Sequence, residues 1–263
     1  MDNKIKEQWN VKDYLKQYYT LTKLSRDEVK LFQYIITFLK KFPKNHFENF
    51  LDFGSGPVIH RLVPFAPYVR NIFLADYLQS NLKEINFWIK GRQETHDWDD
   101  QILHILQIEE EVNFLKKNSY VKNLASRKRL IRSKVRNLYK GNIFNKKPIN
   151  AKKQFSLLAS FYCADSITSS KKQWKSAMQN MLNLVVPRGW VILSALRNTN
   201  KYKVGDTYFP SPNINEKDVV RILTENDFDS KTINVKIIPA HDWKTEGIKS
   251  LMVIRAQKKD GNC

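Results

Sequence analysis

The sequence predicts an α/β fold in which a mainly parallel sheet carries helices on both faces. Short apolar runs of strand length alternate along the chain with longer segments of helical periodicity, as in strands joined by crossover helices. A glycine turn follows the first apolar run directly, as in strand–turn–helix units that bind ligands. The 263 residues, 42% of them hydrophobic, are enough to bury one sizeable core. We therefore expect residues 1–263 to form a single domain.

The N-terminal segment, residues 1–26, is polar with interspersed aromatic side chains, and we expect it to form a lid. Ser25-Arg-Asp-Glu28 has the Ser-x-x-Glu form of a capping box, whose side chains bond the free N–H groups at the start of a helix. Apolar residues at helical spacing follow it. A helix of roughly four turns is therefore predicted after Ser25.

The first strand–turn–strand unit begins at Phe50–Phe53, a short apolar run that leads into Gly54-Ser-Gly-Pro57. Val58–Val69 is predicted to be the crossover helix that follows this turn. Ile72–Asp76 is predicted to be the second strand, and it ends in an acid. The next helix is expected at Asn81–Lys90.

Residues 99–150 interrupt the alternation, and we interpret them as a basic, helix-rich insert. Between Lys116 and Lys147 there are twelve Lys or Arg residues and no acid, so much of the net charge of +19 lies there. Apolar residues in this stretch are spaced to bury one side of a helix, which favours a solvated basic face on the other side. They are Leu124, Leu130, Ile131, Val135 and Leu138.

The C-terminal half continues the alternation of strands and helices. The predicted strands are Phe155–Phe161, Trp190–Ala195, Lys231–Ile238 and Ser250–Ala256, and the predicted helices are Lys172–Val185 and Glu216–Glu225.

Several classes of protein fit the composition poorly. Two cysteines make no disulfide framework, and no Cys or His residues have the spacing of a zinc site, so we expect no metal. No apolar run is long enough to span a membrane, and the first residues lack the apolar centre of a signal peptide. A cytoplasmic location without membrane contact is the expectation, while the sequence leaves the oligomeric state open.

The glycine turn and the acid at the end of the next strand are the most informative pair. Glycines let the backbone approach a ligand closely, and an acid one strand over can bind both hydroxyls of a ribose. Gly54-Ser-Gly56 is followed by Pro57 and lacks the third glycine of the dinucleotide fingerprint. The pattern therefore favours S-adenosylmethionine over a nicotinamide dinucleotide. An ordinary tight turn is the competing interpretation.

The chain resembles the nicotinamide, phenylethanolamine and indolethylamine N-methyltransferase family over nearly its whole length. The matching blocks are Asp13-Tyr-Leu-Lys-Gln-Tyr-Tyr19, Leu51-Asp-Phe-Gly-Ser-Gly-Pro57, Asp76-Tyr77 with Asn81-Leu82, His96-Asp-Trp98, Pro187-Arg-Gly189, and Tyr202 with Gly205. The resemblance implies a Rossmann-like class I methyltransferase with a seven-stranded sheet, and an N-terminal helical lid over S-adenosylmethionine, which leaves as S-adenosylhomocysteine.

The resemblance also implies which residues bind the cofactor. Tyr14 and Tyr19 would close over its methionine end, Asp76 would hold the ribose, and Tyr77 would pack on the adenine. The remaining cofactor positions are Gly54, Ser55, Gly56, His60, Asn81, Asn142, Ile143 and Phe161. Two of these positions depart from the family, because His60 stands where a tyrosine is common and Asn142 where an acid is common. Asp76 could alternatively cap the helix that follows it.

On the acceptor side, Asp165 matches an acid that steers amines in the amine-methylating members. Tyr14, Tyr202, Ser211 and Trp243 match positions that line the pocket. Ala195 stands where the nicotinamide enzyme has an aspartate, so nicotinamide itself fits poorly. Asp165 could instead be a helix N-cap, since hydroxyl residues and a helix follow it.

The expected function is in-line transfer of a methyl group to a small molecule, on an amine or N-heterocycle nitrogen. Positioning and desolvation would supply most of the rate acceleration, with Asp165 accepting a proton if the acceptor is charged. The alternative is a nucleic-acid-binding or nucleic-acid-modifying protein that uses residues 116–147. Its affinity would fall steeply with salt.

Overall fold

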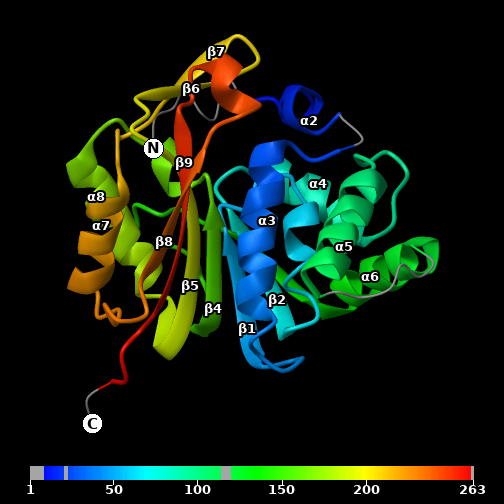
Figure 1. Ribbon diagram of the computed structural model, residues 1–263, viewed down its shortest axis with the longest axis horizontal. Coiled ribbons are helices and arrows are strands. Elements are labelled where there is room, and N and C mark those ends of the chain that lie inside the picture. The colour runs from blue at the N-terminus through cyan, green and yellow to red at the C-terminus, as the bar shows by residue number, and fades with distance from the viewer. Residues whose placement is uncertain (1–8, 21–22, 114–119, 262–263) are drawn as a thin grey trace.

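The computed structural model describes residues 9–20, 23–113 and 120–261. At its centre is a sheet of seven strands in the order β3-β2-β1-β4-β5-β9-β8 (Figure 1). The strands are β1 (Phe47–Phe53), β2 (Val69–Asp76), β3 (Val135–Lys140), β4 (Phe155–Phe161), β5 (Val185–Arg197), β8 (Asn234–Pro239) and β9 (Ser250–Gln257). Strands β1, β2, β3, β4 and β5 are mutually parallel, whereas β9 is antiparallel to both β5 and β8. The predicted mainly parallel seven-stranded α/β sheet is confirmed.

Helices cover both faces of the sheet, as predicted (Figure 1). Phe50 and Ile72 point to the face covered by α3, α4 and α5, whereas the next residues, Leu51 and Phe73, point to the face covered by α7 and α8. This alternation follows from the two-residue period of a strand and buries both faces. The helices are α2 (Val11–Tyr19), α3 (Arg26–Leu39), α4 (Gln79–Ile89), α5 (Asp99–Asn113), α6 (Tyr120–Lys134), α7 (Lys171–Leu182) and α8 (Glu216–Glu225). The Ser25 hydroxyl accepts a hydrogen bond from the Glu28 N–H and caps α3.

The crossover helix predicted at Val58–Val69 is wrong. Only His60–Leu62 forms a short 3₁₀ helix, η1, and turns lead from it into β2 at Val69. Pro64 and Pro67 lie in the predicted span and have no N–H to donate, so a regular helix cannot continue through them. The crossover nevertheless stays buried, because Leu62, Phe65 and their apolar neighbours join the core.

The helical face predicted for the basic stretch is wrong beyond Lys134. Helix α6 ends there, and Val135 and Leu138 belong to the edge strand β3, which pairs in parallel with β2. The pairing places Lys140 beside Asp76 in the register, so residues 135–140 are part of the sheet that carries the glycine turn. The β-branched Val135 is consistent with this conformation.

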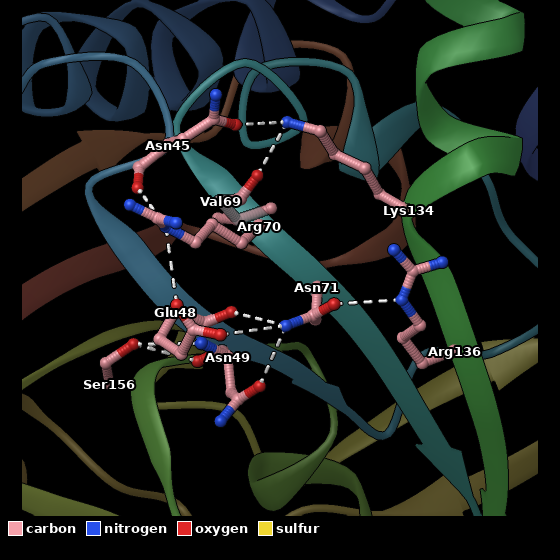
Figure 2. A network of polar contacts seen from close by, with 9 residues as sticks. All are labelled: Asn45, Glu48, Asn49, Val69, Arg70, Asn71, Lys134, Arg136 and Ser156. Carbon is pink, nitrogen blue, oxygen red and sulfur yellow. Dashed lines mark hydrogen bonds and ion pairs between the residues drawn. The ribbon is translucent and has the colours of Figure 1, made fainter.

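Basic side chains of this region also tie the sheet together at the amino ends of β1 and β2 (Figure 2). The Lys134 ammonium donates to the Ala66 and Val69 carbonyls and to the Asn45 side chain, at 2.6 to 2.8 Å. The Arg136 guanidinium donates to the Asn71 side chain at 2.8 Å. These contacts give both charges a role within the fold.

Two further cations of α6 are paired with acids of α5. Arg127 forms a bidentate ion pair with Glu109, and Lys128 pairs with Asp99. The contacts explain part of the basic run structurally, whereas a nucleic-acid partner for the exposed charges stays a prediction. Within the described residues, no helix is both long and apolar enough to cross a membrane.

Candidate active site

A cavity of about 160 Å³ lies at the carboxyl ends of β1, β2 and β4. Ligands bind at this edge in open α/β sheets, where the strand order reverses. Helix α2 and the hairpin of β6 (Lys201–Val204) and β7 (Thr207–Pro210) lie over this end of the sheet (Figure 1). The sequence-predicted residues that line the cavity are Tyr14, Tyr19, Gly54, Gly56, Asp76, Tyr77, Asn81, Ile143, Phe161, Tyr202 and Trp243.

The glycine turn has the backbone conformation that only glycine adopts easily. Gly54 has φ +71° and Gly56 has φ +62°. The N–H groups of Gly54 and Ser55 donate to the Ala75 carbonyl at 2.7 and 3.0 Å, which ties the turn to the end of β2. A Cβ built on Gly54 would lie 2.1 Å from the Cys163 sulfur, whereas the space at Gly56 is open. The turn is therefore closely packed on one side and open to the cavity on the other.

Asp76 is held at the end of β2 by three hydrogen bonds. Its carboxylate accepts from the Gly56 and Leu78 N–H groups, both at 2.8 Å, and from the Asn81 amide at 3.0 Å. Burial raises the pKa of Asp76, and these hydrogen bonds oppose that shift. Leu78, not Asp76, is the N-cap residue of α4. The bonds fix the carboxylate toward the turn, and its role in ribose binding stays a prediction.

The described part of the predicted lid covers the cavity. The Trp9 indole donates to the Asn81 side chain at 3.0 Å, and the Tyr18 hydroxyl donates to the Lys203 carbonyl of β6 at 2.6 Å. The ring centroids of Trp9 and Tyr14 are 4.8 Å apart. Residues 1–8 and 21–22 of the predicted segment lie outside the described residues.

His60 points away from the cavity. Its ring is fully buried, lies 4.9 Å from the Trp98 ring centroid, and has its Nε2 3.4 Å from a Glu28 oxygen. Burial lowers the pKa of His60, and contact with Glu28 opposes that shift. The cavity is lined instead by the next residue, Arg61.

Three more of the predicted residues lie beside the lining rather than in it. The Asn142 side chain accepts from the Phe144 N–H at 3.1 Å and so shapes its own turn, while its neighbours Gly141 and Ile143 line the cavity. Ser55 is buried, with its hydroxyl on the Gly56 carbonyl at 3.3 Å. Ser211 is buried next to the end of β7.

Asp165 lies in the short 3₁₀ helix η2 (Ala164–Ser166) and faces a second cavity of about 20 Å³. One carboxylate oxygen accepts from the Leu196 N–H at 2.7 Å, and the other, also buried, has no partner. The N-cap of α7 is Ser170, so the helix-cap alternative for Asp165 is wrong. Burial raises the pKa of Asp165 to about 7.

This raised pKa predicts a pH-dependent gain in stability for Asp165→Asn. The pKa of Asp165 in the folded chain, about 7, exceeds the value near 3.9 of an unfolded aspartate. The unfavourable free energy of burying the charged carboxylate therefore grows from about pH 4 to pH 7 and stays constant above pH 7. Relative to the native chain, the variant should gain on the order of 2 kcal/mol more at pH 8 than at pH 5. Urea unfolding at the two pH values measures this difference. An identical difference in unfolding free energy between variant and native chain at both pH values would contradict the prediction.

Sequence reasoning did not single out several cavity residues, among them Trp9, Arg61, Tyr162 and Cys163. A lone arginine in a predicted crossover helix carries no signal of its own. Cys163 lines the cavity because it packs against Gly54, and Tyr162 takes the left-handed conformation, with φ +53°, at the end of β4. None of these positions can be recognised before the loop after β4 is placed next to the glycine turn.

The residues present fit S-adenosylmethionine. The open backbone at Gly56 admits close approach of a ligand, and the Asp76 carboxylate is oriented beside it. At the same cavity, the buried Arg61 Nε has no partner and can receive an anionic group. Aromatic side chains supply most of the remaining wall.

Comparisons with known proteins identify the family of the chain. The profile of the NNMT/PNMT/TEMT family matches residues 1–259. Human nicotinamide N-methyltransferase is 23% identical over 215 residues, covering 77% of this chain and 75% of the human enzyme. Rat phenylethanolamine N-methyltransferase is 22% identical over 213 residues, covering 79% of this chain and 72% of the rat enzyme.

Solved structures share the fold at low identity. A Methanosarcina mazei S-adenosylmethionine-dependent methyltransferase has a TM-score of 0.54 at 12% identity, covering 85% of this chain and 98% of that one. The 1,6-didemethyltoxoflavin-N1-methyltransferase of Burkholderia thailandensis has a TM-score of 0.53 at 13% identity, covering 95% of this chain and 85% of that one. The resemblance stated from the sequence is confirmed: the chain belongs to the NNMT/PNMT/TEMT family and is an S-adenosylmethionine-dependent methyltransferase.

Proposed function

We propose that the chain methylates the ring nitrogen of a small, planar, uncharged N-heteroaromatic compound. The observation that carries the proposal is the composition of the cavity wall. Among the described residues, the only acid in this wall is Asp76, and the ribose role expected for it commits its carboxylate to the cofactor. A protonated amine would find no free carboxylate there and would meet the cationic Arg61.

Aromatic side chains form the wall on the side of the proposed acceptor. The rings of Tyr162 and Trp243 meet edge to face with centroids 5.3 Å apart, and Tyr202 stacks on Phe209 at 5.4 Å. Burial raises the pKa of Tyr202, so its hydroxyl stays protonated at neutral pH and can donate a hydrogen bond. Flat apolar walls with few polar groups suit a planar ring.

Methyl transfer to such a nitrogen needs little acid–base catalysis from the protein. When bound, S-adenosylmethionine supplies an electrophilic methyl group on a sulfonium. A heteroaromatic nitrogen has a free lone pair, so the walls need only orient it and exclude water. For an amine acceptor, Asp165 would be the candidate proton acceptor, but it lies outside the lining.

A comparison of matched acceptors tests the proposal. Pyridine- and quinoline-type compounds and primary amines of similar size would be assayed with a labelled methyl donor from pH 7 to pH 9. We expect heteroaromatic acceptors to react at a nearly pH-independent rate. For any amine that reacts, kcat/KM should rise about tenfold per pH unit below the amine pKa, because only the neutral form has a lone pair. Faster methylation of the amine at pH 7 would contradict the proposal.

The names of two similar proteins agree with this acceptor class, whereas the rat relative is named for phenylethanolamine, an amine. The human relative is named for nicotinamide, and the Burkholderia thailandensis structure contains bound 1,6-didemethyltoxoflavin. Here Ala195 stands where the nicotinamide enzyme has an aspartate, as noted above, so nicotinamide itself is not transferred to this chain.

A further inference from the structure

Arg61 is a buried cation that no carboxylate contacts in the described part of the chain. Its side chain is 5% exposed and lines the main cavity. One terminal nitrogen donates to the Tyr19 hydroxyl at 2.9 Å, the other makes a long contact of 3.4 Å with the Phe161 carbonyl, and Nε has no partner. No contact with Arg61 in the described part of the chain comes from a carboxylate.

The buried acids Glu28 and Asp52 raise the pKa of Arg61 from a distance, but neither forms an ion pair with it. Glu28 contacts His60 instead. Asp52 has no hydrogen-bond partner on either oxygen, and burial raises its pKa to about 7, so it offers only a partial negative charge at neutral pH. Burying a guanidinium without a full counter-ion is strongly unfavourable. A cation in this state, at the wall of a ligand cavity, marks the binding place of an anion.

The groups around Arg61 suit a carboxylate in particular. Burial raises the pKa of Tyr19, which keeps its hydroxyl protonated while that oxygen accepts from Arg61. Tyr14, whose side chain hydrogen-bonds Tyr19, lines the same wall. A guanidinium fork and a phenol side by side match the two oxygens of a carboxylate.

We propose that Arg61, together with Tyr19, binds the carboxylate of the methionine portion of the cofactor. The residue before it, His60, occupies the position at which the family commonly has a tyrosine, and it is turned into the core against Trp98. This chain thus uses a charged anchor one residue further along. The proposal concerns the cofactor and holds whichever acceptor class is methylated.

Calorimetry with two ligands tests the assignment. S-adenosylhomocysteine carries the carboxylate, whereas 5′-methylthioadenosine shares the adenosine and the sulfur but lacks the amino-acid portion. Arg61→Met should weaken S-adenosylhomocysteine binding at least tenfold and change 5′-methylthioadenosine binding less than twofold. Arg61→Lys keeps the charge and should give an intermediate loss with the first ligand alone.

A matched control is Arg127→Met, which removes another part-buried arginine that pairs with Glu109 outside the cavity lining. It should leave the ratio of the two affinities unchanged. An equal loss for both ligands with Arg61→Met would show a structural role, and unchanged S-adenosylhomocysteine binding with a raised acceptor KM would place the anion on the acceptor. Either result overturns the proposal. If Arg61→Met does not fold, the same comparison with Arg61→Lys decides the question.

Discussion

Asp76→Ala is expected to weaken the binding of S-adenosylhomocysteine about a hundredfold or more. In the role proposed for it, the carboxylate bonds the ribose hydroxyls, and each hydrogen bond to a charged group contributes about 1.5–3 kcal/mol. The same carboxylate also holds the Gly56 N–H and the Asn81 amide, so its removal loosens the turn that faces the ligand. Isothermal titration calorimetry measures the change directly.

Two further variants separate binding from folding. Asp100→Ala removes an exposed aspartate in the first turn of α5 and should leave the affinity within twofold of the native value. Asp76→Asn keeps the shape and one acceptor oxygen, and it should recover part of the affinity lost in Asp76→Ala. If Asp76→Ala folds and binds S-adenosylhomocysteine as the native chain does, Asp76 does not hold the ribose.

Gly54→Ala is expected to lower the free energy of unfolding by roughly 3 kcal/mol or more and to abolish cofactor binding. The left-handed backbone at φ +71° disfavours a side chain by about 1–2 kcal/mol. The new Cβ would lie 2.1 Å from the Cys163 sulfur and 2.3 Å from the Cys163 Cβ, and such overpacking adds about 1–3 kcal/mol. Urea unfolding and calorimetry measure the two effects.

Gly91→Ala is the matched control, because Gly91 has φ +70° with nothing within 4 Å of the added Cβ. It should lower stability by the backbone contribution alone, about 1 kcal/mol. The clash itself is tested by a double-mutant cycle with Cys163→Gly, which removes both contacting side-chain atoms. Gly54→Ala should cost less stability in the Cys163→Gly background than in the native chain. Equal losses in the two backgrounds would mean that the contact with Cys163 does not matter.

The local sequence pattern was sufficient to predict the glycine turn and the acid that line the cavity. The apolar run Phe50–Phe53, the two glycines after it and Asp76 form a contiguous signal whose residues lie close in the chain. The structure places Gly54, Gly56 and Asp76 in one cavity wall, and their spacing follows from two adjacent parallel strands. The order of these elements, their layers and the lid over them were therefore readable before the fold was known.

The spacing of apolar residues gave wrong predictions in two spans, where it fits a helix but the chain forms turns or a strand. The apolar residues after Gly56 fit a helix, but Pro64 and Pro67 restrict that span to turns. Val135 and Leu138 are three residues apart, a spacing compatible with a helix, yet they lie in the edge strand β3 because β2 offers an unpaired edge. Pairing with a distant strand overrides local propensity.

The α/β class, the family, the cofactor and the glycine–aspartate pair follow from the sequence, since each depends on residues near one another in the chain or on blocks in a fixed order. The orientation of Arg61 rather than His60 toward the cavity, and of Asp165 toward a separate small void, became visible in the folded structure. One step along a tight turn rotates a side chain from the core to the cavity. That rotation is set by long-range packing, here the contacts of His60 with Trp98 and Glu28, which no local pattern encodes.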